Sequence, residues 1–465
     1  MDSGQCPAAP PGTSYPDALQ YLLSFADFER SGRFQDRPDV APMLALLQRL
    51  GDPHLGRPTV HIAGSKGKGS VAAMVDSVLR ADGLTTGLYT SPHLHSYTER
   101  VRINGEPVSE ETFARLTGAL RPAVDAVQAE LGERRLVTFD LLTALAFLAF
   151  REAGVRAQVV EVGLGGRVDS TNVFPAKEAA VITPLSLEHT AVLGDTIEQI
   201  AREKAGIITP GCVAVLAPQP HQAAREVVLQ AARAAGARVV DVAGEYRWRR
   251  LAHDLRGQRI RIEGPRGPIE ARLPLLGAHQ IENAATAVAT VEALAPALPR
   301  AGLRPAPTGA RDGWGGAIVR GLESVRWPCR LEVLRERPLV IADGAHNRDS
   351  AGRLREALRD YFSCERAIFI VGASSDKDIA GLAQEIAPVA GAVIAARARH
   401  PRAMDPALIA AEFGRRGVPA EIVDSVAGAV ERAMAVAGAG GVICLLGSLF
   451  IAAEGREYIL GCARE

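Results

Sequence analysis

The sequence predicts an α/β protein with two domains, each built around a mostly parallel sheet. The chain has 465 residues, which is more than one ordinary hydrophobic core organises. Short apolar runs alternate with segments of helical periodicity along most of it, as in sheets covered by helices on both faces. A stretch rich in Pro, Gly and Arg, residues 296–316, interrupts this alternation. We therefore place the first domain at residues 1–300, a linker at 301–325 and the second domain at 326–465.

The first domain is expected to open with two helices, over residues 18–28 and 41–50. A β-rich run at 59–63 then leads into a glycine-rich loop. Apolar residues recur at helical spacing after this loop until Gly83, which predicts a helix that ends there. Further buried strands are expected at 85–90, 158–162, 179–183 and 212–216, with helices at 139–153 and 197–206.

The pattern changes at residues 246–275, where polar and apolar residues alternate between glycine turns. This predicts a small antiparallel sheet. A helix is expected over 279–294. Beyond the linker, a second series of strands is expected at 339–342, 367–371, 392–395 and 442–446, with helices between them.

Composition restricts the classes of function. The 53 acidic and 53 basic residues give a formal net charge of +0, which argues against a broad nucleic-acid or membrane surface but permits an anionic substrate in a positive cleft. The six cysteines are scattered without a C-x-x-C pair, so neither zinc nor a disulfide framework is indicated. No apolar run approaches the ~20 residues of a membrane span, and the first residues lack signal-peptide features. A cytoplasmic protein is expected.

Lysine is rare, with five residues against 48 arginines. Lys66 and Lys68 share the glycine-rich loop, Lys204 lies in REKAG and Lys377 in SDKD, whereas Lys177 has no evident setting. A chain biased toward arginine should keep lysine where a compact ammonium or a modifiable amine is needed. This argument favours functional roles for Lys68 and Lys204, while Lys377 is expected to be a solvated residue at the start of a helix.

The glycine-rich segment GSKGKGS begins at Gly64 and follows a strand. It departs from G-x-x-x-x-G-K-[ST] because Gly69 separates Lys68 from Ser70. The physical features remain: Gly64, Gly67 and Gly69 let backbone N–H groups converge on an anion, and the next helix adds its positive end. Lys68 can neutralise phosphate charge, and Ser70 offers a hydroxyl to phosphate or magnesium. The segment predicts a nucleotide-phosphate site.

Polar residues also follow other strands of this series. Glu161 ends one strand, Ser91 and His93 follow another, and His189 comes after a third. The carboxyl ends of parallel strands meet at one edge of the sheet, where α/β proteins build their sites. A carboxylate, a hydroxyl and an imidazole could hold a hard cation there, magnesium above all.

Seven segments together resemble the folylpolyglutamate synthase and dihydrofolate synthase family, a branch of the Mur ligases. In chain order they read HIAGSKGKGS, TSPHLHSYTERVRING, EVGLGGRVDSTN, LEHTAVLGDTIEQIAREKAGI, GAHQIENAATA, WPCRLEVL and DGAHN. The resemblance extends from about Tyr21 to Leu460. It implies a Mur-ligase-like fold, in which a central P-loop ATPase domain with a mostly parallel sheet precedes a C-terminal Rossmann-like α/β domain.

The resemblance implies ATP-dependent amide formation in folate biosynthesis. ATP would phosphorylate the carboxylate of dihydropteroate or of a reduced folate, and the amino group of L-glutamate would attack the acyl phosphate. Two anions must meet in such a reaction, so cations have to screen them. The family implies two magnesium ions and a monomer.

The resemblance also assigns roles. Ser91 and Glu161 would hold one magnesium, and His189 with a carbamylated Lys204 the other, while Lys68, Lys204 and His346 would act in catalysis. With the loop prediction, the nucleotide set is Gly64, Ser65, Lys66, Gly67, Lys68, Gly69, Ser70, Asn283, Arg330 and Asp343. The acceptor pocket would comprise Ser91, Pro92, His93, Phe139, Val168, Asp169 and Ser170.

Three residues depart from the family pattern without deleting a proposed ligand. Lys66 replaces a common asparagine, Glu188 replaces aspartate before His189, and Cys329 replaces a common glycine. Two alternative functions stay open: another Mur-type amino-acid ligase, and a non-catalytic ATP-binding regulator on the same scaffold. The sequence does not distinguish dihydrofolate synthesis from folate polyglutamylation.

Overall fold

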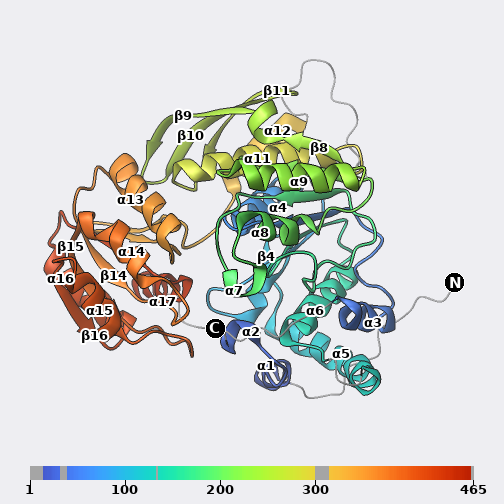
Figure 1. The fold of residues 1–465 in the computed structure, drawn as a ribbon, viewed down its shortest axis with the longest axis horizontal. Helices are drawn as coiled ribbons and strands as arrows, with labels where there is room; N and C mark the ends of the chain where they lie inside the picture. The colour runs from blue at the N-terminus through green and yellow to red at the C-terminus, as the bar shows by residue number, and fades with distance from the viewer. Residues whose placement is uncertain (1–13, 32–38, 132–134, 299–313, 462–465) are drawn as a thin grey trace.

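The computed structural model describes residues 14–31, 39–131, 135–298 and 314–461. Figure 1 shows two lobes, one running from blue to yellow and the other from orange to red. Each lobe contains a mixed sheet with helices against it, which confirms the predicted α/β class.

The first domain is built on an eight-stranded sheet in the order β4-β3-β2-β5-β1-β6-β7-β8. Its six central and distal strands, β2, β5, β1, β6, β7 and β8, are parallel, and β3 and β4 add an antiparallel edge. The strands are β1 (Thr59–Ala63), β2 (Thr86–Tyr89), β3 (Val101–Ile103), β4 (Glu106–Pro107), β5 (Ala157–Glu161), β6 (Ala179–Ile182), β7 (Val213–Leu216) and β8 (Arg238–Asp241). The phosphate loop therefore leaves the middle of the sheet.

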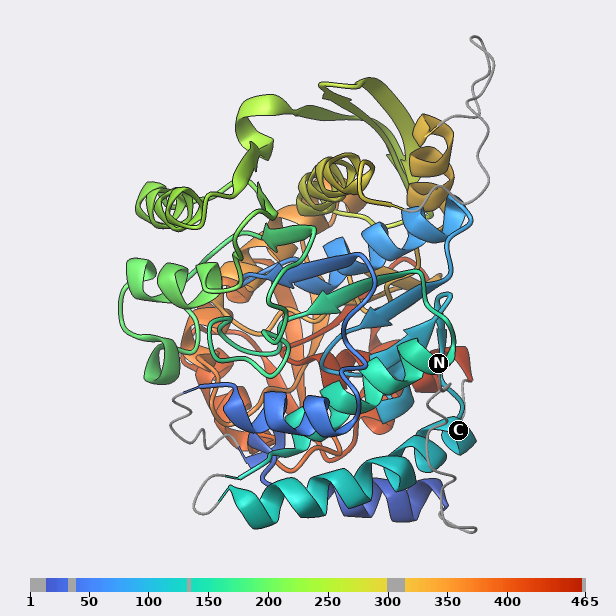
Figure 2. The same ribbon diagram turned by 90° about the vertical axis from the view of Figure 1, so that its right-hand side faces the viewer.

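Helices cover both faces of this sheet because its central strands are buried on both sides (Figure 2). On one face, α4 (Lys68–Ala81) and α11 (Ala278–Leu294) pack on the strands, and α12 (Trp314–Ser324) packs on α4. On the other face, α6 (Thr138–Glu152) packs on the strands, and α1 (Tyr15–Leu23), α3 (Ala41–Arg49) and α5 (Glu110–Glu130) pack around α6. The remaining helices are α2 (Phe28–Ser31), α7 (Thr190–Leu193), α8 (Ile197–Ala205), α9 (Gln222–Ala234), α10 (Val242–Glu245) and the 3₁₀ turn Tyr97–Arg100.

The helix expected over 18–28 is two helices, α1 and α2. The Ser14 hydroxyl accepts from the N–H of Asp17, which starts α1 early. Asp27 accepts from the N–H of Arg30 and so caps α2 as a separate helix. Local side-chain caps thus divide a segment that apolar periodicity alone predicts to be continuous.

The antiparallel sheet predicted near residues 246–275 is present as β9 (Arg247–Asp254), β10 (Gly257–Gly264) and β11 (Gly267–Leu273). It packs with α11 and α12. Of the segment expected to be a linker, residues 301–313 lie outside the described residues, and residues 314–324 form α12. This helix packs closely on α4, since a Cβ at Gly321 would lie 2.4 Å from the Cα of Val78.

The second domain contains a six-stranded sheet in the order β12-β13-β17-β14-β15-β16, parallel except for β12. Its strands are β12 (Glu332–Glu336), β13 (Leu339–Ala342), β14 (Ala367–Val371), β15 (Ala390–Ala396), β16 (Ala420–Val423) and β17 (Val442–Leu446). Its helices are α13 (Arg348–Phe362), α14 (Ile379–Ile386), α15 (Pro406–Gly414), α16 (Val426–Ala437) and α17 (Leu449–Leu460), with a 3₁₀ turn at Ala387–Val389. Within the described parts of the chain, we find no helix long and apolar enough to cross a membrane.

Candidate active site between the two domains

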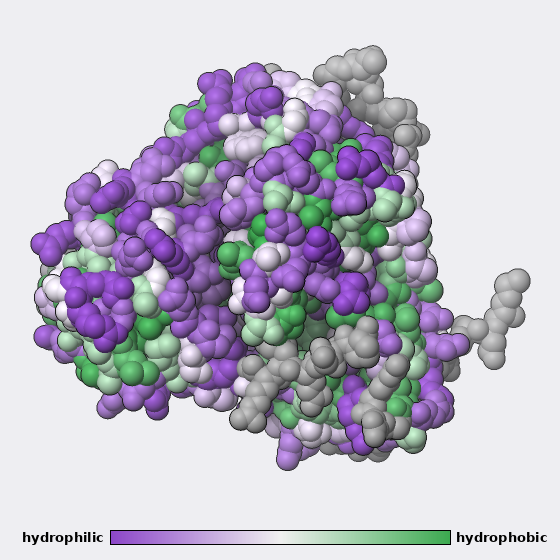
Figure 3. Space-filling view, in the orientation of Figure 1, coloured by the Kyte–Doolittle hydropathy of each residue, from purple (hydrophilic) through white to green (hydrophobic). Residues whose placement is uncertain are grey.

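A cavity of about 820 Å³ lies where the two domains face each other. Figure 3 shows the surface hollowed between the lobes, with hydrophilic residues along the hollow. Every site residue predicted from the sequence lines this cavity. Segments as distant as Gly64 and His346 are therefore brought together, although their individual roles remain predictions.

The phosphate loop is held in a conformation that only glycine adopts without strain. Gly64 has a φ of 152°, and a Cβ there would lie 1.8 Å from the Thr183 hydroxyl oxygen. Gly67 has a φ of 85° and directly precedes α4. The N–H groups of Ser65 and Lys66 both donate to the carbonyl of Pro184, at 3.1 Å. The loop is thus pinned beside β6, with the positive end of α4 at the cavity.

Helix α11 supports the loop from the other side. Gln280 donates to the Ser70 hydroxyl at 3.4 Å, and Asn283 donates to Gln280 at 3.0 Å. A Cβ at Gly67 would lie 2.5 Å from the side-chain oxygen of Asn283. Asn283 therefore reaches the phosphate loop, as its predicted nucleotide contact requires.

Glu161 and Ser91 form a pair suited to magnesium. Glu161 is only 5% exposed, accepts from the Ser91 N–H at 3.3 Å and lies 4.0 Å from the ammonium of Lys68. Burial raises the pKa of Glu161, against the opposing effect of Lys68. The described residues include no cluster of three or more His, Cys, Asp or Glu able to hold a metal. Magnesium at phosphates needs only one or two protein ligands, so this pair fits it.

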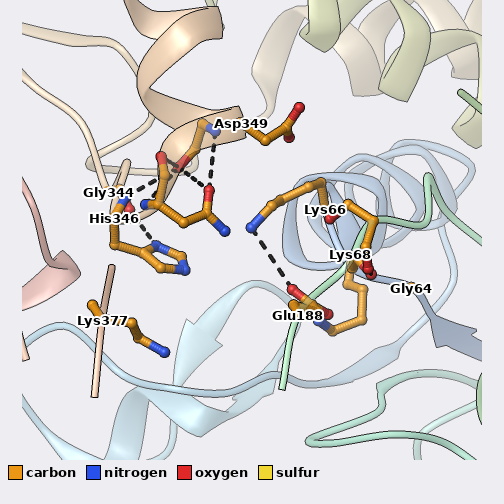
Figure 4. A network of polar contacts seen from close by, with 12 residues as sticks. Gly64, Lys66, Lys68, Glu188, Gly344, His346, Asp349 and Lys377 are labelled. Atoms are coloured by element: carbon orange, nitrogen blue, oxygen red, sulfur yellow. Dashed lines mark hydrogen bonds and ion pairs between the residues drawn. The ribbon is translucent and has the colours of Figure 1, made fainter. Parts of the chain in front are cut away.

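Glu188 contacts two of the five lysines of the chain, Lys204 and Lys66. Lys204 is buried and donates to the Gly64 carbonyl at 3.0 Å and to Glu188 at 3.1 Å. Lys66 lies 3.7 Å from the other oxygen of Glu188 (Figure 4). Burial lowers the pKa of Lys204 to about 8, while the nearby lysines outweigh burial and lower that of Glu188 to about 2. Glu188, which the sequence analysis notes as a departure from the family pattern, therefore lies within the site.

His189 follows Glu188 at the start of α7, with a φ of 49°. Burial lowers its pKa to about 4, so the imidazole is neutral at physiological pH. A neutral imidazole is the form that binds metals. The position and charge of His189 are therefore compatible with its predicted role.

The second domain contributes a cluster that follows β13. Asp343 accepts from the N–H groups of Leu331 and Ala345, each at 2.8 Å. A Cβ at Gly344 would lie 2.5 Å from an Arg330 guanidinium nitrogen, so this side chain packs directly on the turn. The turn thus fixes the carboxylate, and the guanidinium lies against the turn at the cavity.

His346 belongs to the same turn, and Figure 4 shows it facing the phosphate loop across the cavity. Its Nδ1 lies 2.9 Å from the carbonyl oxygen of Gly344. Because a carbonyl only accepts, Nδ1 carries the proton. Burial lowers the pKa of His346 to about 3, so the ring is neutral and its Nε2 is an acceptor.

The predicted acceptor pocket lines another part of the same cavity. Phe139 lies partly buried in the first turn of α6, and a Cβ at Gly163 would lie 2.5 Å from its ring. Ser170 donates to Asp140 at 2.8 Å, and Val168 and Pro92 also line the wall. The ring and the polar groups together suit a planar, hydrogen-bonding ligand.

His93 is held by a residue that the sequence does not reveal. Arg100 is 2% exposed, forms ion-paired hydrogen bonds with Glu29 and donates to Nδ1 of His93 at 3.0 Å. Glu29 comes from α2, far away in sequence, so no motif contains this triad. Only the tertiary contact shows that the N-terminal helices stabilise the pocket.

Lys377 lines the cavity, whereas the sequence suggests a solvated helix-start residue. It lies 3.0 Å from Asp376, which also pairs with Arg402 at 2.9 Å. His400 lies beside them on the cavity wall. The scarcity of lysine was the available signal for Lys377, and nothing in the sequence marked Arg402 among so many arginines.

Comparisons with known proteins agree with this architecture. The Mur ligase middle domain matches residues 62–291, and the Mur ligase glutamate ligase domain matches residues 329–449. A Mycobacterium tuberculosis dihydrofolate synthase/folylpolyglutamate synthase is 36% identical over 434 residues, 90% of this chain and 86% of that relative. A probable bifunctional folylpolyglutamate synthase/dihydropteroate synthase of Haloferax volcanii is 34% identical over 95% of this chain, which spans about half of that relative's length.

Solved structures show the same fold. Mycobacterium tuberculosis folylpolyglutamate synthase complexed with ADP superposes with a TM-score of 0.84 at 34% identity, over 95% of this chain and 99% of that one. Escherichia coli FolC in complex with DHPP and ADP superposes with a TM-score of 0.81 at 29% identity, over 97% of this chain and 98% of that one. The expected Mur-ligase-like fold is thereby confirmed. This chain belongs to the folylpolyglutamate synthase/dihydrofolate synthase family of Mur ligases.

Proposed function

We propose that this protein uses ATP to join L-glutamate to a pteridine-bearing carboxylate, namely dihydropteroate, a reduced folate or both, as a cytoplasmic monomer. The observation that carries the proposal is the convergence of the phosphate loop, a buried carboxylate and cationic residues of the second domain on one cavity. The named activities of the relatives in the comparisons support it.

The residues divide the chemistry as follows. Lys68 and the amino end of α4 bind the transferring phosphate, and Arg330 approaches it from the second domain. Neutral His346 presents Nε2 toward the same region, where it can accept a hydrogen bond. Ser91 and Glu161 would hold one magnesium ion, which screens the charge of phosphate and carboxylate. Closer approach of the two domains would exclude water from the acyl phosphate.

Lys204 is proposed to be carbamylated. Its lowered pKa supplies a neutral amine, whose lone pair can attack carbon dioxide to form an N–C bond with loss of one proton. The product is a carboxylate-like group beside His189, and both would hold a second magnesium. Carbamylation requires Glu188 to turn away from Lys204, because two anions would otherwise meet.

The carbamate is tested by replacement and by labelling. Lys204→Ala should abolish turnover, and acetate should partly restore it by supplying the missing carboxylate. Carbon-13 NMR of protein in labelled bicarbonate should show a carbamate signal that this variant lacks. Wild-type activity in Lys204→Ala would eliminate the role.

The incoming L-glutamate is proposed to bind on the second domain. Lys377, Arg402 and His400 line that side of the cavity and can receive its two carboxylates. Asp376 pairs with both Lys377 and Arg402. It can orient these two side chains or accept a hydrogen bond from the amino group of L-glutamate.

The function is tested by phosphate release from ATP. With magnesium, the purified protein should release phosphate only when L-glutamate is present together with dihydropteroate or tetrahydrofolate. Competition between these two acceptors would show which reaction dominates. Activity with another acceptor class would favour a different Mur-type ligase, and tight ATP binding without ligation would favour a regulator.

A further inference from the structure

Lys177 is a buried lysine for which the proposed reaction has no use. It lies in the loop before β6 and is 5% exposed. Its amine lies 2.9 Å from Nδ1 of His61 and donates to the side-chain oxygen of Asn172 at 3.2 Å. Among the described residues, no carboxylate forms an ion pair with it. A buried amine is costly unless its hydrogen bonds are satisfied, so its partners need an explanation.

Those partners lead to the acceptor pocket. His61 is fully buried in β1, and its Nε2 lies 2.8 Å from the hydroxyl of Thr171. That hydroxyl donates to Oδ1 of Asp169 at 2.5 Å, and the Thr171 N–H donates to the same oxygen at 3.0 Å. Three consecutive hydrogen bonds therefore connect Lys177 to Asp169. We call Lys177, His61 and Thr171 the relay.

The direction of the relay follows from its carboxylate end. The Thr171 hydroxyl donates its one proton to Asp169, so its oxygen accepts from His61. Nε2 of His61 then carries the ring proton, and Nδ1 accepts from Lys177. Burial lowers the pKa of His61 well below its usual value, which agrees with a neutral ring. Lys177, His61 and Thr171 therefore each donate one hydrogen bond toward Asp169.

Asp169 lines the acceptor pocket. Its Oδ2 accepts from the N–H of Leu164 at 2.9 Å. A Cβ at Gly163 would lie 3.2 Å from this oxygen and 2.5 Å from the Phe139 ring, so the carboxylate and the ring share one wall. A planar heterocycle stacked on Phe139 would present its edge to Asp169.

We propose that the relay residues are positioning residues, which fix the rotation of the Asp169 carboxylate so that it reads the N–H edge of the acceptor. The ligand class is a planar N-heterocycle with adjacent N–H donors, as on the amino-pyrimidinone edge of a pteridine. This inference rests on the proposed function. Hydrogen-bond donors hold both oxygens of this carboxylate, so it loses little conformational freedom when a ligand binds. Residues that support a ligand-binding group in this way increase the affinity for the ligand.

The relay is tested with Thr171→Val, which removes the hydroxyl at nearly constant volume. The dissociation constant for dihydropteroate should rise about tenfold, while that for ATP stays unchanged. Thr171→Ser keeps the hydroxyl and should bind like the wild type. Thr117→Val is a matched control, since Thr117 is equally buried and its hydroxyl donates to the Phe113 carbonyl within α5.

A second readout separates positioning from general loosening. An analogue of dihydropteroate without the 2-amino group should bind the wild type more weakly, and this discrimination should shrink in Thr171→Val and in Lys177→Met. Lys177→Met also serves if Thr171→Val does not fold. Full affinity and full discrimination in these variants would overturn the relay alone. Failure of the wild type to bind either dihydropteroate or tetrahydrofolate would overturn both the relay and the proposed function.

Discussion

At the residue scale, Lys177 should make stability depend on pH. Burial lowers its pKa from 10.5 to about 7, so between these values the unfolded chain binds a proton that the folded chain has released. Stability therefore increases as pH rises through this window, and the cost of burying the charge is fully present below about pH 7. The slope is at most about 1.4 kcal/mol per pH unit.

Lys177→Met isolates this effect. The free energy of unfolding in urea should be measured for both proteins from about pH 6 to about pH 9. The difference, wild type minus variant, should be flat below about pH 7 and then rise in favour of the wild type. A difference that stays constant across the window would show that the buried amine keeps its proton.

Individual site residues were predictable where a short segment determines their setting. The GSKGKGS loop identified Lys68 because the glycines and the lysine act within a few residues. The surroundings of Lys177 and Arg100 were not predictable, because His61 and Glu29 reach them through tertiary contacts alone. The reach of Glu188 to both Lys66 and Lys204 was likewise visible only in the folded chain.

At the element scale, the buried strands agree with the sequence predictions to within about two residues, because apolar runs mark them directly. The partly exposed strands β8, β12 and β16 lacked such runs and were not predicted. The sequence analysis predicts a linker where α12 lies, because the stretch before this helix is rich in Pro, Gly and Arg. Its apolar face packs on the first domain through Ile318 and Leu322.

The contact of α12 with α4 yields a prediction. Gly321→Ala would place a methyl group 2.4 Å from the Val78 Cα, so the helices must separate, and we expect a loss of about 1–3 kcal/mol in unfolding free energy. Gly315→Ala in the same helix meets nothing within 4 Å and should change stability by about 1 kcal/mol or less. Urea unfolding compares the two. Equal effects would mean that this contact does not restrain the helices.

At the scale of the whole molecule, the two domains touch on two sides of the cavity. On one side, Tyr361 donates to Gln258 at 2.7 Å, and Arg250 pairs with Asp360 at 2.7 Å. On the other, His95 lies 2.7 Å from Glu457 of α17. The His95 loop also carries Ser91 and His93. The second contact therefore links the position of the second domain to the proposed metal and acceptor sites.

Glu457→Gln should weaken this contact, because it removes the charge that faces His95 and Arg399 while keeping the side-chain volume. Both pairs are partly solvated, so the effect is modest, about 0.5–1 kcal/mol. A larger open population should raise the radius of gyration in small-angle scattering and raise KM for ATP about threefold. A non-hydrolysable ATP analogue with acceptor should restore wild-type compactness.

Glu431→Gln, which alters an exposed contact to Tyr458 on the same domain, is the control and should change neither measurement. If Glu457→Gln matches this control, domain closure does not depend on the His95 contact.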